Sequence, residues 1–172
     1  LLACWPSVSQ ALSIDDYAIN PEGHVLFIRH ALAPGNGDPS HFGMEDCQTQ
    51  RNLSEAGREQ ARQIGAKLRA ANLKIDAILS SQWCRCKDTA TEMGLGPVSL
   101  APGLNSFYQG IVPKKETLAR LRKRLDSLDG REGITIMVTH FVTISAITGI
   151  GVSSGGMVSY NPQTGVAELI GD

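Results

Sequence analysis

The sequence predicts an α/β fold, a three-layer α/β/α sandwich with a mostly parallel sheet and an antiparallel hairpin at one edge. Three continuous apolar runs, His24–Ile28, Ala77–Leu79 and Ile134–Val138, predict strands that are buried on both faces. Amphipathic segments with helical spacing lie between these runs, and strands that alternate with helices favour a parallel sheet. The length of 172 residues fits one domain that can bury a core without a metal or a disulfide.

The first half of the chain alternates strands and helices. Pro and Gly residues between Ala33 and Pro39 predict a loop after the first strand. Ser54 is expected to cap a helix, because its hydroxyl can accept a free backbone N–H. The apolar face of that helix consists of Ala61, Ile64, Leu68 and Ala71. After the second strand we expect a helix over about Trp83–Met93 and a short strand near Val98–Leu100.

The second half continues the alternation and ends in a hairpin. We expect a loop over Ala101–Pro113, and then a basic amphipathic helix over Lys114–Leu128 whose Lys and Arg residues form a solvated face. A helix through Ile144–Ile147 follows the third strand and should stop at Gly149. The predicted hairpin pairs Val158–Tyr160 with Val166–Ile170 across a turn that contains Asn, Pro and Gly.

The composition excludes two classes of function. Lys and Arg number 16 against 17 Asp and Glu, so the formal net charge is -1 and no basic field would attract nucleic acid. Aromatic residues make up only 5%, too few for platforms that stack single-stranded bases. No apolar run reaches the roughly 18 residues that a membrane-spanning helix needs, so we expect no transmembrane segment.

Residues 1–20 are expected to be an N-terminal arm or the remnant of a signal sequence, ahead of one domain over 21–172. Leu1–Ala11 resembles the end of a signal peptide, and Ser9-Gln10-Ala11 is a small-x-small cleavage pattern. This predicts a periplasmic or otherwise exported protein. A lipoprotein-like box ending at Cys4 and a loose arm on a cytoplasmic protein are the alternatives. On the first reading we expect the first dozen residues to pack little against the domain.

The four cysteines are Cys4, Cys47, Cys84 and Cys86. No C-x-x-C pair occurs, so their spacing predicts no metal site. We expect buried, inert thiols, and a bridge from Cys47 to Cys84 or Cys86 is the main alternative.

Polar residues end each of the three apolar runs. Arg29-His30 follows the first, Ser80-Ser81 follows the second with Arg85 just beyond, and Thr139-His140 follows the third. The carboxyl ends of parallel strands meet at one edge of a sheet, where ligands of α/β proteins bind. Arg grips phosphate with paired N–H donors, and a neutral imidazole can attack phosphorus. The sequence therefore predicts a site for an anion with several oxygens.

These residues belong to motifs that resemble the histidine phosphatase superfamily, in the branch of the phosphoglycerate mutases. Ile28-Arg29-His30-Ala31 resembles the Arg-His-Gly signature, and Asn36 matches an Asn that commonly follows it. Leu53–Ala61 is similar to the family's L-T-x-x-G-x-x-Q-A helix start, and Ser80–Ala90 to its S-S-x-x-x-R-x-x-x-T-A segment. Val138-Thr139-His140 corresponds to the motif of the second histidine.

The resemblance implies roles for these residues. His30 would attack phosphorus and become phosphohistidine, while Arg29, Arg85 and His140 would hold the phosphoryl oxygens. Asn36 would contact the phosphate or a nearby backbone group, and Arg51 either reaches the substrate or lies in a solvated loop. The resemblance implies no metal and no other cofactor.

Two positions depart from the family pattern. Ala31 stands in place of the usual Gly, and Leu104-Asn105-Ser106 lacks the acid that would normally protonate the leaving group. The loop after the first strand carries three carboxylates, Asp38, Glu45 and Asp46. Asp38 is the candidate donor, because two prolines stiffen the loop around it. The alternative is that Asp38 only supports the turn through its own backbone bonds.

Three functions follow from these residues. The first is a metal-independent phosphomonoester hydrolase of the histidine acid phosphatase type, acting on a phosphorylated small molecule or glycolipid such as a phosphosugar of the cell envelope. The second is a phosphohistidine protein phosphatase with a phosphoprotein substrate, whose leaving imidazole needs less help than an alcohol. The third is an inactive phosphate-binding module, which the intact His30, Arg29, Arg85 and His140 argue against.

Overall fold

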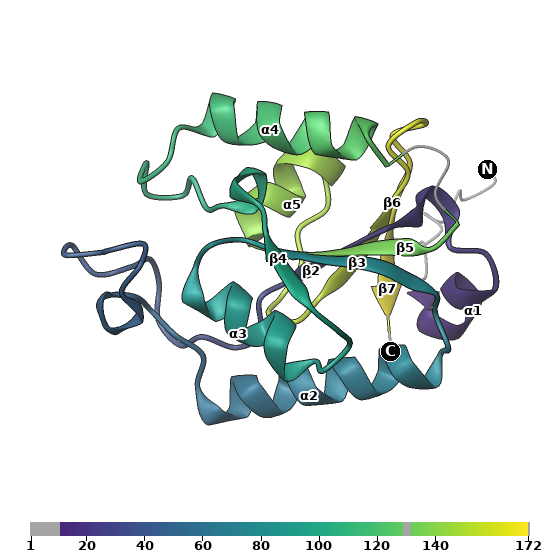
Figure 1. Cartoon of the computed structure of the whole chain (residues 1–172), viewed down its shortest axis with the longest axis horizontal. Coiled ribbons are helices and arrows are strands. Elements are labelled where there is room, and N and C mark those ends of the chain that lie inside the picture. The colour runs from purple at the N-terminus through teal and green to yellow at the C-terminus, as the bar shows by residue number, and fades with distance from the viewer. Residues whose placement is uncertain (1–10, 129–131, 172) are drawn as a thin grey trace, which may run out of the picture.

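The computed structural model describes residues 11–128 and 132–171. A single sheet of seven strands, in the order β1-β7-β6-β2-β5-β3-β4, forms the middle of the domain (Figure 1). Every strand runs in the same direction except β6, which is antiparallel to both of its neighbours. The strands are β1 Leu12–Ser13, β2 Val25–Arg29, β3 Ile75–Ser80, β4 Val98–Leu100, β5 Ile134–Thr139, β6 Met157–Tyr160 and β7 Ala167–Gly171.

Helices cover both faces of this sheet, so the predicted three-layer α/β/α architecture is confirmed. In Figure 1, α2 and α3 lie below the sheet and α4 and α5 above it, while α1 lies at one end. The helices are α1 Ile14–Ile19, α2 Glu55–Ala70, α3 Cys84–Glu92, α4 Lys114–Asp126 and α5 Phe141–Thr148. Short 3-10 turns are η1 Glu22–His24, η2 Cys47–Thr49 and η3 Pro102–Leu104.

Strand β2 lies inside the sheet and divides its side chains between two apolar cores. Leu26 and Ile28 pack in the core between the sheet and helices α2 and α3. Val25 and Phe27 pack in the core between the sheet and helices α4 and α5. Side chains of a strand alternate between its two faces, so a strand covered by helices on both sides must be apolar throughout. Burial on both faces therefore explains why the sequence of β2 is an uninterrupted apolar run.

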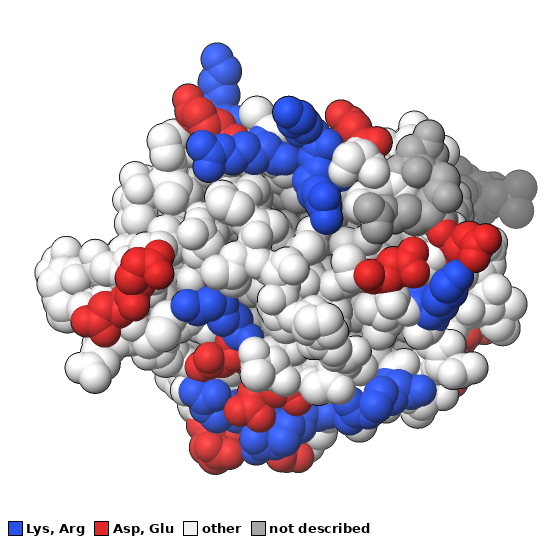
Figure 2. All heavy atoms as spheres, in the orientation of Figure 1, with Lys and Arg blue, Asp and Glu red and all other residues white. Residues whose placement is uncertain are grey.

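The helix boundaries follow local chemistry that the sequence displays. The Ser54 hydroxyl accepts the Gly57 N–H at 3.1 Å and caps α2, as predicted. Gly149 ends α5 with a φ of 75°, a conformation that costs glycine nothing. Helix α4 carries its basic residues on the surface, where Figure 2 shows Lys and Arg gathered along the upper edge of the molecule. None of the described helices is long and apolar enough to cross a membrane.

The segment just before β2 differs from the expected loose arm. Leu12 and Ser13 pair with Ile170 and Gly171, so β1 extends the sheet beyond the C-terminal hairpin and the hairpin is not the outermost element. Helix α1 follows, and its Tyr17 is only 1% exposed, because it packs in the core that the sheet shares with α2 and α3. Residues 12–19 therefore pack on the domain, because one large aromatic side chain anchors a short amphipathic turn. Residues 1–10, including Cys4 and Trp5, lie outside the described residues.

Candidate active site

The carboxyl ends of three neighbouring strands meet at one pocket. Strand β2 ends at Arg29 and leads into His30, β5 leads into His140, and β3 leads through a short turn into α3 and Arg85. The pocket has a volume of about 210 Å³. It is lined by Arg29, His30, Asn36, Gly37, Arg51, Arg85, Ser106, Tyr108, Gln109, His140, Phe141 and Val142. The structure thus brings together six of the seven site residues predicted from the sequence; the exception is Asp38.

The hydrogen bond of His30 fixes its tautomer. Nδ1 lies 2.8 Å from the carbonyl oxygen of Ala31, which can only accept, so Nδ1 carries the hydrogen. The lone pair of the imidazole therefore lies on Nε2. Burial, reinforced by the positive charge of nearby arginines, lowers the pKa of His30 to about 3. A neutral imidazole with a free Nε2 is the form that can act as a nucleophile.

His140 lies beside His30, with ring centres 5.5 Å apart. Its Nε2 is 2.9 Å from the Ser81 hydroxyl, which in turn donates to Asn105 Oδ1 at 3.2 Å. Burial, followed by the charge of Arg85, lowers the pKa of His140 well below its ordinary value. Because the Ser81 hydroxyl donates to Asn105, the His140 Nε2–H donates to Ser81. His140 Nδ1 then carries a lone pair, and it has no hydrogen-bond partner among the described residues.

Three arginines give the pocket its positive charge. Burial and the charge of Arg85 lower the pKa of both Arg29 and Arg51, so the guanidinium groups repel one another. Within the described part of the chain, the N–H donors at Arg29 Nε and Arg85 Nε are buried without a hydrogen-bond partner. Buried donors without partners are costly. An anion with several oxygens would both pair with these nitrogens and relieve the repulsion.

Two predicted residues hold the loop as well as line the pocket. Arg51 Nε donates to the carbonyl of Gly37 at 2.8 Å, and its Nη1 donates to that of Ala33. Arg51 is therefore half-buried and bound to the loop, so the expected alternative of a solvated loop residue does not hold. Asn36 Nδ2 donates to the Tyr108 hydroxyl at 3.3 Å, which joins the two loops that border the pocket.

Asp38 does not line the pocket, and its geometry does not suit a proton donor. Its two carboxylate oxygens accept from Arg85 Nη1 at 2.8 Å and Nη2 at 3.2 Å. The Trp83 indole N–H and the Arg51 backbone N–H also donate to the carboxylate, at 2.9 and 3.0 Å. Burial alone would raise the pKa of Asp38, but the hydrogen bonds from Arg85 and the Arg51 backbone hold it below the usual value. The expected general acid is thus an anion with its oxygens occupied.

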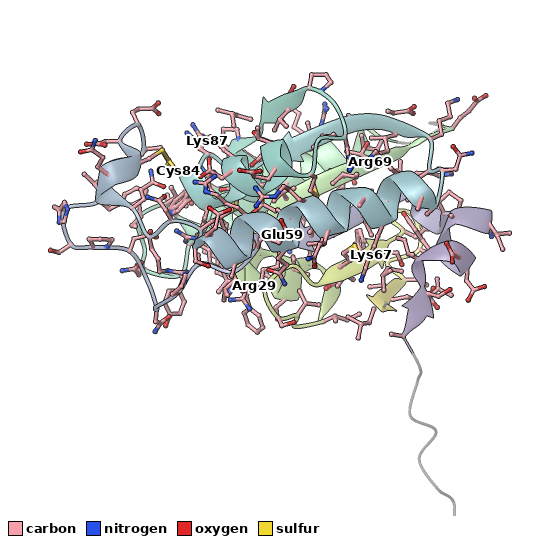
Figure 3. The ribbon with its side chains drawn as sticks, turned by 90° about the horizontal axis from the view of Figure 1, so that it is seen from below. Arg29, Glu59, Lys67, Arg69, Cys84 and Lys87 are labelled. Atoms are coloured by element: carbon pink, nitrogen blue, oxygen red, sulfur yellow. A yellow bond between two sulfur atoms is a disulfide. The ribbon has the colours of Figure 1, made fainter. Side chains whose placement is uncertain are left out.

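The disulfide Cys47–Cys84 ties the same loop to the beginning of α3 (Figure 3). Gln50 adds to this connection, because its Oε1 accepts the Cys84 N–H at 2.9 Å. Cys86 is free and buried. The expectation of thiols alone is therefore wrong for Cys47 and Cys84, and the alternative of a bridge is correct. Cys84, one end of the bridge, directly precedes Arg85 in the sequence.

The first turns of α2 hold the backbone that follows His30. Ser54 N donates to the Leu32 carbonyl at 3.1 Å, and Leu32 N donates to Gln60 Oε1 at 2.9 Å. A Cβ on Gly57 would lie 2.0 Å from that carbonyl, so only glycine allows the close approach. The start of α2, which carries a family motif, thus fixes the backbone two residues after His30.

Several pocket residues were not singled out from the sequence as site residues. Tyr108 and Gln109 come from the loop before α4, and Phe141 and Val142 from the first turn of α5. Large side chains directly after a strand-end histidine were a usable signal for Phe141 and Val142. Tyr108 and Gln109 carried no such signal, because their loop is placed by tertiary contacts.

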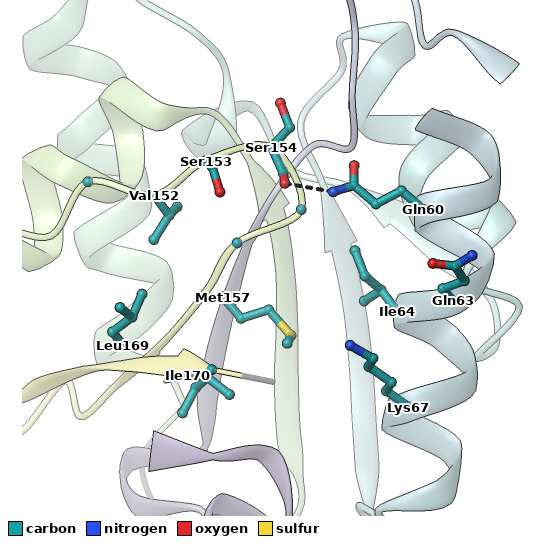
Figure 4. Close-up of a pocket in the computed structure, with 14 residues that line it drawn as sticks. Gln60, Gln63, Ile64, Lys67, Val152, Ser153, Ser154, Met157, Leu169 and Ile170 are labelled. Atoms are coloured by element: carbon teal, nitrogen blue, oxygen red, sulfur yellow. Dashed lines mark hydrogen bonds between the residues drawn. The ribbon is translucent and has the colours of Figure 1, made fainter. Parts of the chain in front are cut away.

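A larger pocket, of about 460 Å³, lies elsewhere, between α2 and the hairpin of β6 and β7 (Figure 4). Gln60 spans its upper end, where Nε2 donates to the Ser154 carbonyl at 2.9 Å. Its lining contains no His, Cys, Asp or Glu, and Lys67 is its one charged side chain. Size alone does not make a reactive site, so the smaller pocket with two histidines is the candidate. Among the described residues, no three His, Cys, Asp or Glu side chains gather as metal ligands do.

Known structures share this fold at low sequence identity. The protein histidine phosphatase SixA in complex with tungstate superposes with a TM-score of 0.59 at 16% identity, over 84% of this chain and 92% of SixA. A mycobacterial glucosyl-3-phosphoglycerate phosphatase gives 0.56 at 18%, over 84% and 95%. A phosphoserine phosphatase from Entamoeba histolytica gives 0.57 at 19%, over 84% and 93%. The comparison with curated proteins found no match.

A family model provides the assignment that such distant structures cannot. It matches residues 25–124, a range that begins with β2 and its Arg29-His30 and includes Arg85. The matched residues place a neutral histidine among arginines at the ends of parallel strands. On this match the chain belongs to the histidine phosphatase superfamily, branch 1.

Proposed function

We propose that this protein is a phosphatase that transfers the phosphoryl group of its substrate to His30. The tautomer of His30 carries the proposal, because Nδ1–H donates to Ala31 and leaves the Nε2 lone pair for attack. In the first step Nε2 forms a bond to phosphorus while the bond to the leaving group breaks and its electron pair departs with that group. In the second step water attacks phosphorus, the P–N bond breaks, and phosphate leaves.

Arg29 and Arg85 would bind the phosphoryl oxygens during both steps, and His140 would join them once its Nδ1 has taken up a proton. The unpartnered Nε–H groups of Arg29 and Arg85 are buried at the pocket, so little reorganisation is needed when charge develops on those oxygens. Arg51 and Asn36 border the same space and would add further donors. These groups make turnover a better interpretation than a phosphate-binding module without activity.

The pocket favours substrates whose leaving group is a weak base, because such a group can depart without first being protonated. No Asp or Glu is among the residues that line the pocket, so no carboxyl is placed to protonate a departing alkoxide. The imidazole that leaves from phosphohistidine needs less help from a proton donor than an alkoxide does. We therefore favour a phosphohistidine-bearing protein as the substrate over a phosphosugar.

A second candidate rests on the disulfide. Disulfides persist in oxidising compartments, so Cys47–Cys84 supports an exported protein. In such a compartment a phosphorylated sugar or glycolipid of the cell envelope is the expected substrate. This candidate needs a proton donor that comes from the substrate or from water.

Both candidates are tested with one panel. The oxidised protein is given a histidine-phosphorylated protein, a phosphorylated envelope glycolipid and an alkyl phosphate, and phosphate release is measured with and without EDTA. We expect the first substrate to be favoured and EDTA to have no effect. Radiolabelled substrate should leave an acid-labile, base-stable label on the protein that is absent from His30→Ala. Full turnover by His30→Ala would refute the proposed function, and preference for the glycolipid would select the second candidate.

A further inference from the structure

The rim of the active-site pocket contains two exposed aromatic rings. Tyr108 is 57% exposed and Phe141 is 44% exposed, and both line the pocket that holds His30. Exposed aromatic side chains are common when they occur singly. Here two rings line one cationic pocket of about 210 Å³, together with the groups assigned to the phosphoryl oxygens. A leaving group that departs from phosphorus beside His30 lies in this same pocket, which the two rings border.

Neighbouring groups hold both rings in place. The Tyr108 hydroxyl accepts from Asn36 Nδ2 at 3.3 Å, and its backbone N–H donates to the Ser106 hydroxyl at 3.4 Å. The Arg29 guanidinium lies 5.5 Å from the centre of the Phe141 ring. Rings that are ordered before a ligand arrives bind it at a smaller entropic cost.

The contact with Gly151 is further evidence that the Phe141 ring is held in one position. A Cβ on Gly151 would lie 2.8 Å from Cε2 of Phe141, so the ring packs directly against backbone on that side. The ring therefore has a fixed neighbour on one side and the Arg29 cation near its centre, while nearly half of it remains open.

The chemistry of the pocket agrees with an aromatic leaving group. Since no carboxyl lines the pocket, a leaving group has to accept the electron pair of the broken bond without being protonated by one. A nitrophenolate spreads that charge over its ring, and an imidazole whose other nitrogen carries a hydrogen leaves as a neutral ring. Both groups present a flat face for stacking.

We infer that Tyr108 and Phe141 form a subsite for a planar aromatic leaving group, which makes the enzyme select phosphoryl donors by that ring. The imidazole of a phosphohistidine and the ring of an aryl phosphate belong to this class. The inference rests on the proposed function and adds the residues that recognise the group opposite the phosphoryl oxygens.

The test compares two donors whose leaving groups depart without protonation, p-nitrophenyl phosphate and acetyl phosphate. Only the first has a ring. Tyr108→Leu and Phe141→Leu should each lower the ratio of kcat/KM for p-nitrophenyl phosphate to that for acetyl phosphate by about tenfold, since a lost aromatic contact is worth up to about that factor. Ile19→Ala, at an exposed position on α1, should leave the ratio unchanged.

Tyr108→Phe separates stacking from proton transfer. It keeps the ring and removes the hydroxyl, so the ratio should stay within about twofold of the original value. A loss as large as in Tyr108→Leu would show that the hydroxyl acts, and would overturn the subsite. An equal loss on both donors in Phe141→Leu would also overturn it, because Phe141 would then act through Arg29.

Failure of the subsite can be told apart from failure of the proposed function. The phosphoenzyme on His30 is trapped with acetyl phosphate, which does not use the rings. If no label forms on His30, the proposed function fails, whereas the ratio of the two donors still reports on Tyr108 and Phe141. An unchanged ratio in both leucine variants refutes the subsite whether or not the label forms.

Discussion

Asp38 binds Arg85 through both carboxylate oxygens, at 2.8 and 3.2 Å, in an ion pair that is almost completely buried. This pair uses both Nη atoms of Arg85 and leaves its Nε, which is buried without a partner in the described residues. Buried ion pairs contribute little net stability, because the desolvation of both charges offsets their attraction. We therefore interpret Asp38 as a positioning residue that fixes the orientation of Arg85.

This interpretation predicts the behaviour of Asp38→Asn. Trp83 and the Arg51 backbone donate to different oxygens of Asp38, so the single amide oxygen can accept from only one of them, and the NH2 group faces the other donor. Arg85 loses its counter-charge and shifts. We expect kcat/KM to fall by about 100-fold, equally for alkyl and aryl phosphates. The free energy of unfolding should fall by about 3 kcal/mol, as for a buried pair that loses one partner. Glu45→Gln, at an exposed position of the same loop, is the control. A loss confined to alkyl phosphates would restore the proton-donor role.

The burial of His30 should make the stability of the protein depend on pH. The pKa of His30 is about 3 in the folded protein and about 6.5 when the residue is solvated, so only the unfolded chain binds this proton between those values. Stability is then lost as the pH falls below 6.5, by up to about 1.4 kcal/mol per pH unit. Between pH 6.5 and 5 this amounts to about 2 kcal/mol, or roughly 4–8 °C in Tm.

Thermal unfolding of the protein and of His30→Asn at several pH values measures that contribution. The variant should show a Tm that falls less steeply with acidification, by the amount stated. His41→Asn, changed at an exposed position, is the matched control. Parallel curves for the protein and His30→Asn would contradict the low pKa of His30.

Reduction of Cys47–Cys84 should destabilise the protein and reduce its activity. The bridge spans 37 residues, and opening a loop of this size typically lowers the free energy of unfolding by about 2–4 kcal/mol. The loop that carries Asp38 and Arg51 then loses one of its attachments to α3. We expect dithiothreitol to lower Tm and kcat/KM together. In the Cys47→Ala/Cys84→Ala protein both values should be low from the start and insensitive to dithiothreitol, and a response there would assign the effect to another group.

Gly57→Ala tests whether the close packing of α2 against Leu32 positions the backbone that follows His30. The new methyl group would lie 2.0 Å from the Leu32 carbonyl and push the backbone that follows His30. We expect a loss of about 1–3 kcal/mol in stability and a fall in kcat at a temperature where the variant is folded. Gly65→Ala makes a similar contact, 1.9 Å from the Met93 carbonyl, but away from the pocket. It should lose stability while keeping kcat, and equal kcat in both variants would contradict the role of Gly57.

The sequence predicted the elements that depend on local patterns. Buried strands carry uninterrupted apolar runs, and the Ser54 cap and the Gly149 stop are set by neighbours a few residues away. The pocket also followed, because parallel strands deliver their polar ends to one edge. Arg29, His30, Arg85 and His140 were found in this way.

Features that depend on distant contacts were missed or misplaced. Asp38 and Arg85 are 47 residues apart, so the loop sequence alone could not show that the carboxylate was already occupied. Strand β1 has only two residues, and its pairing with β7 requires the other end of the chain. The choice of Cys84 over Cys86 depends on which side of α3 faces the loop, which spacing alone left open.

The pairing of β2 has a consequence for how the protein is made. Val25 pairs with Thr135 on one side and with Tyr160 on the other. During synthesis the first long strand therefore emerges well before either of its neighbours, and its apolar side chains have no sheet to join. Folding dominated by such non-local pairing is slow and exposes strand edges to aggregation. His30, which follows β2, therefore acquires its surroundings only after β6 at Met157–Tyr160 has left the ribosome, and this interval is when a chaperone would matter most.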